Sequence, residues 1–363
     1  MGSAELPFSK DAPMNGRTRL FPLNENNLHD TLKKAAAIIN EGGLVAFPTE
    51  TVYGLGANAL DAKAVRAVFE AKGRPADNPL IVHISSKQQC CKLARNIPEK
   101  AFKLMDKFWP GPLTLILERQ EIVPDVTTGG LDTVALRMPD NEIALGLIRV
   151  SGQPLAAPSA NLSGKPSPTT AQHVISDLWE RIDAVIDGGT VEIGLESTVI
   201  DMTLRVPAIL RPGRISLEDI EKEIGSITTG YLDGSQPESA AVRSPGMKYT
   251  HYAPDATVIL IEGASANVVR RIQEMLKTYG FAGVKVGLLL TDESNMTIHQ
   301  DDQLSLGSKD KPAELAFNLF SGLRSLDARG VDIILVDGSF SRHGIGEAVS
   351  NRIRKAARSI IKV

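Results

Sequence analysis

The sequence predicts two α/β domains in one chain, and three observations carry this prediction. The length of 363 residues exceeds what one hydrophobic core usually organises. Apolar runs of strand length alternate with segments of helical period, first up to residue 215 and again from residue 256. Between them the composition shifts toward Gly, Ser and Pro. Residues 21–215 and 256–363 are therefore the expected domains, joined by a linker over residues 216–255.

The first domain is expected to mix strands and helices. Helices are expected over residues 28–40, 61–71, 98–108 and 169–179, and strands over residues 44–47, 80–84, 113–117, 133–137, 155–157, 184–187, 197–201 and 208–211. Gly42 and Gly43 are typical helix stops because glycine tolerates positive φ. Asp61 suits the positive start of the second helix, and Thr169 with Gln172 forms a plausible capping box for the fourth. Residues 48–56 are expected to form a polar, glycine-rich loop.

The second domain alternates regularly. Strands are expected over residues 257–261, 285–290 and 332–336, and helices over residues 266–279, 312–329 and 346–361. Because parallel strands need crossover connections, this order predicts a smaller, Rossmann-like parallel sheet covered by helices. The end of the linker, Ser244 to Pro254, is richer in Tyr, His and Lys than a spacer requires.

Composition excludes several classes of protein. Hydrophobic residues at 42% and charged residues at 23% rule out a wholly disordered or collagen-like chain. The net charge of −3 shows no global basic excess, which does not exclude a local basic cavity. Cys90 and Cys91 are the two cysteines, and adjacent thiols supply neither an ordinary disulfide nor a zinc cage, so a reducing cytoplasm is expected. No apolar run approaches the roughly 18 residues of a membrane span, and residues 1–20 are expected to be a flexible leader.

One glycine motif is misleading. The segment from Gly54 to Ala59 matches a dinucleotide-binding fingerprint, and Asp77 lies near the expected downstream acid. In that fold, however, the first glycine follows its strand directly and the motif opens a helix. Here six residues follow the strand before Gly54, and the helical pattern begins only at Asp61. Dinucleotide binding is therefore not expected, and no Walker A sequence occurs.

Cationic and hydroxyl side chains recur where strands are expected to end. Lys72 and Arg74 together suit a polyphosphate, although a solvated helix C-terminus is the competing interpretation. Arg137 ends a strand whose neighbourhood is apolar and needs an anion, which a structural salt bridge would equally supply. These cations are accompanied by polar residues at similar places: Thr49, Thr51, Asn78, His83, Thr133, Ser159, Asn161, Ser167, Ser197, Thr198, Arg211 and Arg214. No nucleophile elbow, metal cluster or carboxylate dyad is evident, so the set favours binding a phosphorylated, carboxylate-bearing ligand set.

Several segments together resemble the YrdC-like threonylcarbamoyl-adenylate synthase family. They are Phe47-Pro-Thr-Glu-Thr-Val-Tyr-Gly-Leu-Gly56, Lys72-Gly-Arg-Pro-Ala-Asp-Asn-Pro-Leu80, Pro158-Ser-Ala-Asn161 and Glu196-Ser-Thr198. The stretches from Ser244 to Pro254 and from Gly346 to Ala356 are similar to the family's long form, which has an extra C-terminal domain. The resemblance implies a YrdC-like twisted, open mixed sheet for the first domain. It also implies a linker that reaches back over the active site.

The resemblance further implies an activity. ATP, L-threonine and bicarbonate or CO₂ would be condensed to threonylcarbamoyl-AMP and pyrophosphate, with Mg²⁺ accompanying the triphosphate. A separate tRNA threonylcarbamoyl-transferase complex would then use the product at N6 of adenosine 37 in tRNAs reading codons that begin with A. In this assignment threonine is held by Thr51, His83, Arg137, Ala157 and Ser197. ATP is held by Lys72, Arg74, Asn78, Thr133, Ser159, Ser167, Arg211 and Tyr249, with Tyr252 as the alternative tyrosine. Lys72 and Arg74, on the phosphates, are the expected catalytic residues.

Two other functions compete with this one. A non-catalytic RNA-binding module would use the same cations, with Arg214, on the phosphates of a tRNA or double-stranded RNA, and its binding would weaken steeply with salt. Carbamoyl transfer from carbamoyl phosphate, as in hydrogenase-maturation relatives, is the closer rival. Those relatives carry acylphosphatase-like and zinc-finger modules, and two adjacent cysteines do not supply the second.

Overall fold

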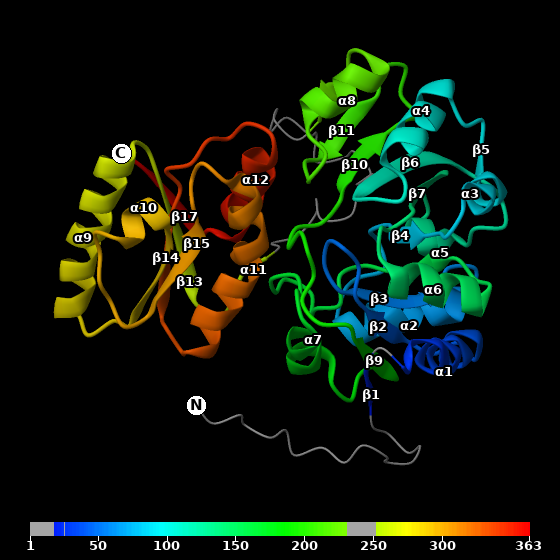
Figure 1. Cartoon of the computed structure of the whole chain (residues 1–363), viewed down its shortest axis with the longest axis horizontal. Helices are drawn as coiled ribbons and strands as arrows, with labels where there is room; N and C mark the ends of the chain where they lie inside the picture. Colours follow the sequence, from blue (N-terminus) through cyan, green and yellow to red (C-terminus); the bar gives the residue numbers. More distant parts are fainter. Residues whose placement is uncertain (1–17, 25, 231–251) are drawn as a thin grey trace.

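The computed structural model describes residues 18–24, 26–230 and 252–363, which form two sheets, each covered by its own helices (Figure 1). The first domain holds a mixed sheet of twelve strands and the second holds a parallel sheet of five. The predicted fold class, a mixed α/β sheet followed by a smaller parallel α/β unit, is confirmed. None of the described helices combines the length and apolar character that crossing a bilayer requires.

The first domain is built from twelve strands and eight helices within the described ranges. Its strands are β1 (Arg19–Pro22), β2 (Val45–Phe47), β3 (Gly54–Asn58), β4 (Ile81–His83), β5 (Ala94–Arg95), β6 (Leu113–Arg119), β7 (Thr133–Arg137), β8 (Leu155–Ala156), β9 (Ala184–Asp187), β10 (Thr198–Asp201), β11 (Ala208–Arg211) and β12 (Thr228–Thr229). Its helices are α1 (Leu28–Asn40), α2 (Ala62–Lys72), α3 (Lys87–Leu93), α4 (Glu99–Phe108), α5 (Asp125–Thr128), α6 (Glu142–Ser151), α7 (Ala171–Leu178) and α8 (Leu217–Ile224).

The strand order of the large sheet brings three strand ends to one edge. The order is β1-β9-β2-β3-β8-β4-β7-β6-β10-β11-β12, with β5 paired to β6. β4 runs parallel to β7, while β6 and β10 run opposite to β7 and β11 runs opposite to β10. The carboxyl ends of β4, β7 and β11 therefore share an edge, and His83, Arg137 and Arg211 are their last residues. This edge positions the candidate site.

Both faces of the large sheet are buried at its central strands. Along β2, Val45 and Phe47 pack under α1 and α6, whereas Ala46 between them joins the core on the other face. This alternation follows from the period of two along a strand. Burial on both faces explains why the strands appear in the sequence as continuous apolar runs rather than as alternating ones.

The structure differs from the sequence-based expectations in the first domain at several places. The expected loop over residues 48–56 ends in a strand, β3, which lacks β-branched residues because it approaches Phe47 closely: a Cβ at Gly56 would lie 2.6 Å from Phe47 Cε1. Helix α7 is capped by Thr170 rather than Thr169. The expected leader over residues 1–20 falls outside the described residues up to residue 17, and β1 begins at Arg19. Helix α6 and the short α3, α5 and β5 were not expected.

The expected linker over residues 216–255 also differs in its first part. Ser216 and Asp219 form a capping box that starts α8, and Ile220 and Ile224 bury its apolar face. β12 then pairs with β11, so the first sheet continues to Thr229. Residues 231–251 lie outside the described part of the chain, and with them most of the segment from Ser244 to Pro254.

The second domain contains the strands and helices that the sequence indicates, with additions. Its strands are β13 (Thr257–Glu262), β14 (Val286–Thr291), β15 (Gln303–Gly307), β16 (Ile333–Asp337) and β17 (Ser359–Lys362), and its helices are α9 (Ser265–Phe281), α10 (Asp292–Asn295), α11 (Pro312–Ala328) and α12 (Ile345–Ala356). All strand pairs are parallel, in the order β15-β14-β16-β13-β17. The expected helix over residues 346–361 stops at Ala356, because the apolar residues after it pair with β13 as β17.

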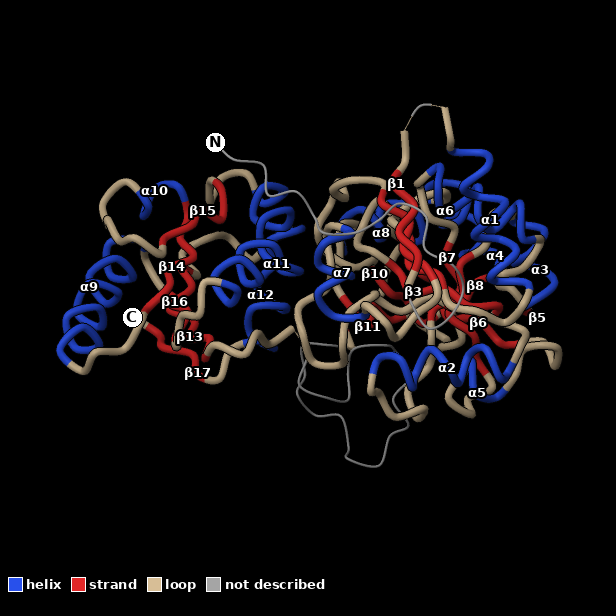
Figure 2. Tube along the Cα trace, turned by 90° about the horizontal axis from the view of Figure 1, so that it is seen from below, coloured by secondary structure: helices blue, strands red, loops and turns tan. Residues whose placement is uncertain are grey.

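The two domains lie side by side, with α11 and α12 on the face of the small sheet that is turned toward the first domain and α9 on the outer face (Figures 1 and 2). Val52 and Leu195 of the first domain pack into the apolar cluster of the second. At Gly194, which has φ +82°, a Cβ would lie 2.6 Å from the Ala316 carbonyl oxygen of α11. Only glycine permits so close an approach of the two domains there.

Candidate active site

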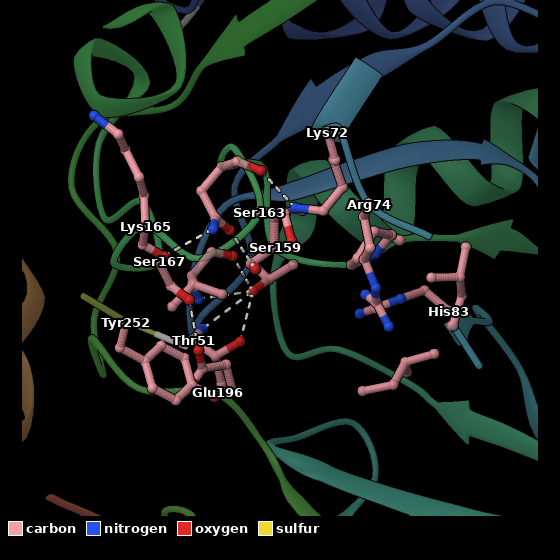
Figure 3. A pocket seen from close by; sticks show the side chains of 18 of the residues that line it. Thr51, Lys72, Arg74, His83, Ser159, Ser163, Lys165, Ser167, Glu196 and Tyr252 are labelled. Atoms are coloured by element: carbon pink, nitrogen blue, oxygen red, sulfur yellow. Dashed lines mark hydrogen bonds between the residues drawn. The ribbon is translucent and has the colours of Figure 1, made fainter. Parts of the chain in front are cut away.

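A pocket opens at the edge of the large sheet where β4, β7 and β11 end, and it gathers most of the predicted site residues (Figure 3). The predicted residues that line it are Thr51, Lys72, Arg74, His83, Arg137, Ala157, Ser159, Ser167 and Arg211. Lys72, Arg74 and His83 lie on one side of the view, and Ser167, Glu196 and Tyr252 lie on the other. Side chains from segments more than a hundred residues apart therefore meet in one cavity.

Arg137 is the buried cation at the end of β7. Its Nη2 lies 2.8 Å from Glu50 Oε2 and donates to Thr51 Oγ1 at 2.8 Å. Both charged side chains are 4% exposed. Arg137 Nε and Glu50 Oε1 have no hydrogen-bond partner among the described residues. Arg137 thus forms a structural salt bridge, as the alternative interpretation expects, and its Nε is left without a hydrogen-bond partner among the described residues.

His83 is neutral in this site. It is the register partner of Arg137 across β4 and β7, and its ring meets the edge of Phe47 with 6.4 Å between centroids. Burial, together with the charge of Arg137, lowers the pKa of His83 to about 3. His83 Nδ1 has no partner among the described residues. The ring therefore offers a hydrogen bond but no charge.

Lys72 and Arg74 enter the pocket from the end of α2. Gly73, at φ 60°, ends the helix in the left-handed conformation, so the chain turns sharply between the two cations. Lys72 Nζ donates to the carbonyl oxygens of Ser159 and Asn161, each at 2.6 Å. Burial and the nearby Arg74 lower the pKa of Lys72 to about 7. Lys72 is 3% exposed, so it is not the solvated cation at a helix end that the competing interpretation requires.

The segment after β8 supplies hydroxyl and amide groups. Ser159 Oγ donates to Asn161 Oδ1 at 2.5 Å, and Asn161 Nδ2 donates to the carbonyl oxygens of Leu162 and Lys165. Lys165 lines the pocket, yet its ammonium points away from it toward Asp255 (Figure 3). With Lys72 bound to its carbonyls, this segment forms a polar wall held by several hydrogen bonds.

Glu196 is the pocket's carboxylate. Its Oε1 accepts a hydrogen bond from Ser167 Oγ, and Tyr252 also hydrogen-bonds to it. Burial raises the pKa of Glu196, but Arg352, Arg211 and the bond from Ser167 outweigh burial and hold it below its usual range. Burial, aided by Glu196, raises the pKa of Tyr252 to about 12, so the phenol is protonated at neutral pH.

Four predicted residues do not line the pocket. Ser197 is buried behind it, where its Oγ contacts Thr114 Oγ1 at 2.7 Å and accepts from Arg211 Nη2 at 3.1 Å. Asn78 is fully buried, and its carbonyl accepts from Arg74 while both polar atoms of its side chain lack partners among the described residues. Thr133 begins β7, at the opposite end of the strand from Arg137. Tyr249 lies outside the described residues; the alternative, Tyr252, lines the pocket.

The sequence-based reasoning missed residues whose partners are distant. Glu50 lies in a motif that was recognised, but its pairing with Arg137 spans 87 positions of sequence. Glu196 opens another recognised motif and was not assigned a role. Arg352, in the second domain, is paired with Glu196 at 3.0 Å. The local signal for Arg352 is the presence of an arginine on the apolar face of its helix.

The part of the chain that the structure describes contains no group of three or more His, Cys, Asp or Glu arranged to hold a metal ion. The pocket's Glu196 is already engaged by Ser167, Tyr252 and Arg352. Glu196 alone does not provide the several ligands that a protein metal site needs. Cys90 and Cys91 are both free thiols, the first buried and the second exposed.

Two family models match the chain. The model described as "Telomere recombination", for the Sua5, YciO and YrdC proteins, matches residues 37–213, and the model described as "Threonylcarbamoyl-AMP synthase, C-terminal domain" matches residues 215–358. The chain is 54% identical over 334 residues to the threonylcarbamoyl-AMP synthase of Pyrococcus abyssi, covering 92% of this chain and 96% of that protein. It is 49% identical over 328 residues to the Bacillus subtilis protein of the same name, covering 90% and 92%.

A solved structure is similar over nearly the whole chain. It is the crystal structure of Pyrococcus abyssi Sua5 complexed with L-threonine, which matches with a TM-score of 0.90 and 52% identity, covering 95% of this chain and 100% of that one. The structure of a doubly substituted variant of the same protein matches with a TM-score of 0.89. The similarity therefore includes both domains.

Proposed function

The chain belongs to the threonylcarbamoyl-AMP synthase family, and from this premise we propose that it condenses L-threonine, bicarbonate or CO₂ and ATP to threonylcarbamoyl-AMP and pyrophosphate. The observation that carries the proposal is that Arg137, Lys72 and Arg74 line the same pocket; we assign Arg137 to a carboxylate and the other two to phosphates. A relative that is 52% identical binds L-threonine in its crystal structure. The RNA-binding alternative would use the same cations, but it gives no reason for a relative to bind L-threonine.

Threonine is proposed to bind at the ends of β4 and β7. The Nε of Arg137, which has no partner among the described residues, would donate to the threonine carboxylate. Nη2 of the same guanidinium already contacts Glu50 and Thr51. The neutral ring of His83 and the hydroxyl of Thr51 would bind the polar atoms of the amino acid. Ala157 lines the pocket beside them and would contact the apolar methyl. Ser197 would act from behind, by holding Arg211.

ATP is proposed to bind across the pocket, from Lys72 and Arg74, which lie on the same side as His83, to Ser167 and Tyr252 on the other. Lys72 and Arg74 would contact its phosphates, and Ser159, Ser167 and Arg211 would hold the rest of the nucleotide with Tyr252. The unpartnered amide of Asn78 lies next to Arg74 and would orient it or the nucleotide. Thr133, at the far end of β7, is the weakest member of the predicted ATP set because it does not line the pocket.

The chemistry asks for positioning rather than for a protein nucleophile. The threonine amine forms a carbamate, with loss of water if it reacts with bicarbonate or of a proton if it reacts with CO₂. A carbamate oxygen then attacks the α-phosphorus of ATP, and pyrophosphate leaves. Negative charge accumulates on the phosphates, and the fixed cations of the pocket offset it without rearrangement. Because His83 is neutral, Arg137 is the charged partner that is proposed for the carboxylate. Tyr252 and Glu196 line the pocket, and their exclusion of water would protect the carbamate and the mixed anhydride.

Mg²⁺ is proposed to enter with ATP, held chiefly by phosphate oxygens. Magnesium commonly binds through substrate phosphates and water with few protein ligands. The described residues fit that mode and do not fit a dedicated protein cage. When bound, the ion would supply charge neutralisation to the triphosphate. The product is proposed to pass to a tRNA threonylcarbamoyl-transferase complex that modifies adenosine 37, in the cytoplasm, where direct contact with tRNA is a further expectation.

The decisive experiment measures pyrophosphate release from ATP. We expect release only when L-threonine and bicarbonate are both present. Serine should react less efficiently by roughly ten- to two-hundredfold, because a missing methyl contributes about 1–3 kcal/mol in an apolar sub-pocket. Release that does not depend on threonine would contradict the proposed reaction, and salt-sensitive RNA binding without release would favour the RNA-binding alternative.

ATP binding is expected to depend on pH through Lys72. In the free protein the pKa of Lys72 is about 7, so the side chain carries its charge below that pH and loses it above. Because a bound phosphate favours the charged form, ATP affinity should fall as the pH rises above about 7, by at most about tenfold per pH unit for one proton. Calorimetric titration at several pH values checks this.

The matched control is Lys72→Arg, whose guanidinium stays charged throughout the range. The ratio of wild-type affinity to variant affinity removes the titration of ATP itself. A ratio that stays constant as the pH rises would show that Lys72 does not titrate in this range.

A further inference from the structure

Arg352 is a fully buried arginine that the second domain inserts into the first. It lies on α12 and is 0% exposed. Its Nε pairs with Glu196 Oε2 at 3.0 Å, and its Nη1 donates to the Pro212 carbonyl oxygen at 2.6 Å. Its guanidinium carbon lies 5.9 Å from the centre of the Tyr252 ring. Burying a charge in this way is costly unless the charge is well paired, and its partners here lie in or beside the pocket.

Glu196 connects Arg352 to the pocket wall. One carboxylate oxygen accepts from Arg352 and the other accepts from Ser167 Oγ, while Tyr252 also bonds to the carboxylate. Tyr252 is fixed on its other side by stacking on Phe320 of α11, with 5.2 Å between ring centroids. Ser167 and Tyr252 both line the pocket, whereas Arg352 is not among its lining residues. Arg352 is thus one contact removed from any ligand.

We propose that Arg352 is a positioning residue of the active site: by holding Glu196, it sets the places of Ser167 and Tyr252 and so makes the second domain part of the nucleotide-binding wall. This inference rests on the proposed function, because it assigns that wall to ATP. It gives the C-terminal domain a defined task at the catalytic pocket, through one side chain.

Without Arg352, the Glu196 carboxylate would keep Arg211 as the nearby cation of the first domain. Arg211 Nε and Nη2 already donate to Ser197. A carboxylate drawn toward Arg211 would turn from Ser167 and Tyr252, and the wall would lose its shape. On the proposed threonine side, the side chain of Arg137 bonds to those of Glu50 and Thr51, and in the described residues none of the three forms a side-chain hydrogen bond or ion pair with Glu196 or Arg352.

The test compares arginine variants by calorimetric titration of ATP and of threonine. For Arg352→Gln we expect ATP affinity to fall by about tenfold or more, the scale of effect of a lost outer partner, while threonine affinity changes by less than about threefold. Arg354→Gln is the matched control: it lies on the same helix, pairs with Glu262 inside the second domain, and should leave both affinities unchanged. Equal losses for ATP and threonine in Arg352→Gln would overturn the inference.

A second comparison separates positioning from simple docking of the domains. Arg324 of α11 also forms an interdomain ion pair, with Asp177 at 2.7 Å, and donates to the carbonyl oxygen of Pro166, next to Ser167. If docking alone mattered, Arg324→Gln should weaken ATP binding at least as much as Arg352→Gln, and that result would contradict the proposal. We expect a clearly smaller loss. Glu196→Gln combined with Arg352→Gln should bind ATP better than Arg352→Gln alone, because no unpaired carboxylate remains.

A structural readout makes the inference testable whatever ligand the pocket takes. In a ligand-free crystal structure of Arg352→Gln, we expect Glu196 to have left Ser167. An unchanged contact between Ser167 and Glu196 would overturn the positioning role even if pyrophosphate release confirms the reaction. Conversely, if Glu196 is displaced in the variant but the wild-type protein shows no threonine-dependent pyrophosphate release, the proposed function is refuted and the positioning role is not. Should Arg352→Gln not fold, Arg352→Lys retains the charge but not the bond to Pro212, and we expect an intermediate displacement and affinity.

Discussion

Arg137→Ala is expected to weaken threonine binding by about a hundredfold or more while ATP affinity stays within a few-fold. A charge-assisted bond between a buried guanidinium and a carboxylate contributes roughly 2–5 kcal/mol when one partner is removed, and 1.4 kcal/mol is a factor of ten. The change also leaves the Glu50 carboxylate buried without its cation at 4% exposure, where it would repel the carboxylate of threonine. Both effects act at the threonine end of the pocket. Calorimetric titration of each ligand measures them separately.

Two further variants distinguish a loss of threonine binding from a folding defect. Arg149→Ala removes an exposed arginine from the neighbouring helix α6 and should change neither affinity. The double variant Glu50→Gln with Arg137→Gln removes both charges, so no unpaired carboxylate remains, and it should fold but still bind threonine poorly. If Arg137→Ala lowers the two affinities equally, Arg137 does not hold the threonine carboxylate.

Lys72→Met is expected to reduce pyrophosphate release by about a hundredfold or more, the usual scale for losing one fixed donor to transition-state charge. Threonine affinity should be retained, because Arg137 and its partners are untouched. Methionine fills the same buried space without a charge to desolvate, so the protein should stay folded. The carbonyl oxygens of Ser159 and Asn161 lose their donor in this variant, which adds a loosening of the polar wall to the loss of charge.

The control for this variant lies on the same helix. Lys63→Met replaces an exposed lysine of α2 and should leave turnover unchanged. Steady-state rates and threonine titrations of both variants provide the comparison. Near-normal release by Lys72→Met would mean that the phosphates bind elsewhere and that Lys72 serves only to hold the carbonyls it contacts.

The sequence predicted those parts of the molecule whose determinants are local. Helix α1, strand β7 and, in the second domain, strands β13, β14 and β16 follow from apolar runs and helix-stop signals within a few residues of themselves. β3 was not predicted because it is rich in glycine. Its Gly56 packs closely against Phe47, and this contact is not visible in the local sequence. The residues of β17 were predicted to continue α12, since the residues of β13 with which they pair lie 100 positions earlier in the sequence.

The pocket shows the same division. Lys72, Arg74, His83 and Arg137 were predicted as site residues because cations and a histidine at strand or helix ends are visible in the sequence. Their roles toward ligands stay predictions. The pairs Glu50 with Arg137 and Glu196 with Arg352 were not predicted, because each joins segments that only the completed fold brings together. A buried carboxylate has no sequence signature until its distant cation is known.

The charges buried between the domains bear on how such proteins can evolve. Asp177 and Glu196 belong to the first domain, and their nearest arginines, Arg324 and Arg352, belong to the second. An ancestor or descendant made of the first sheet alone would have to replace these acids, find cations for them locally, or leave them open to water. Gain or loss of the second domain therefore changes the surroundings of two acids in the first, so the two domains constrain each other's substitutions.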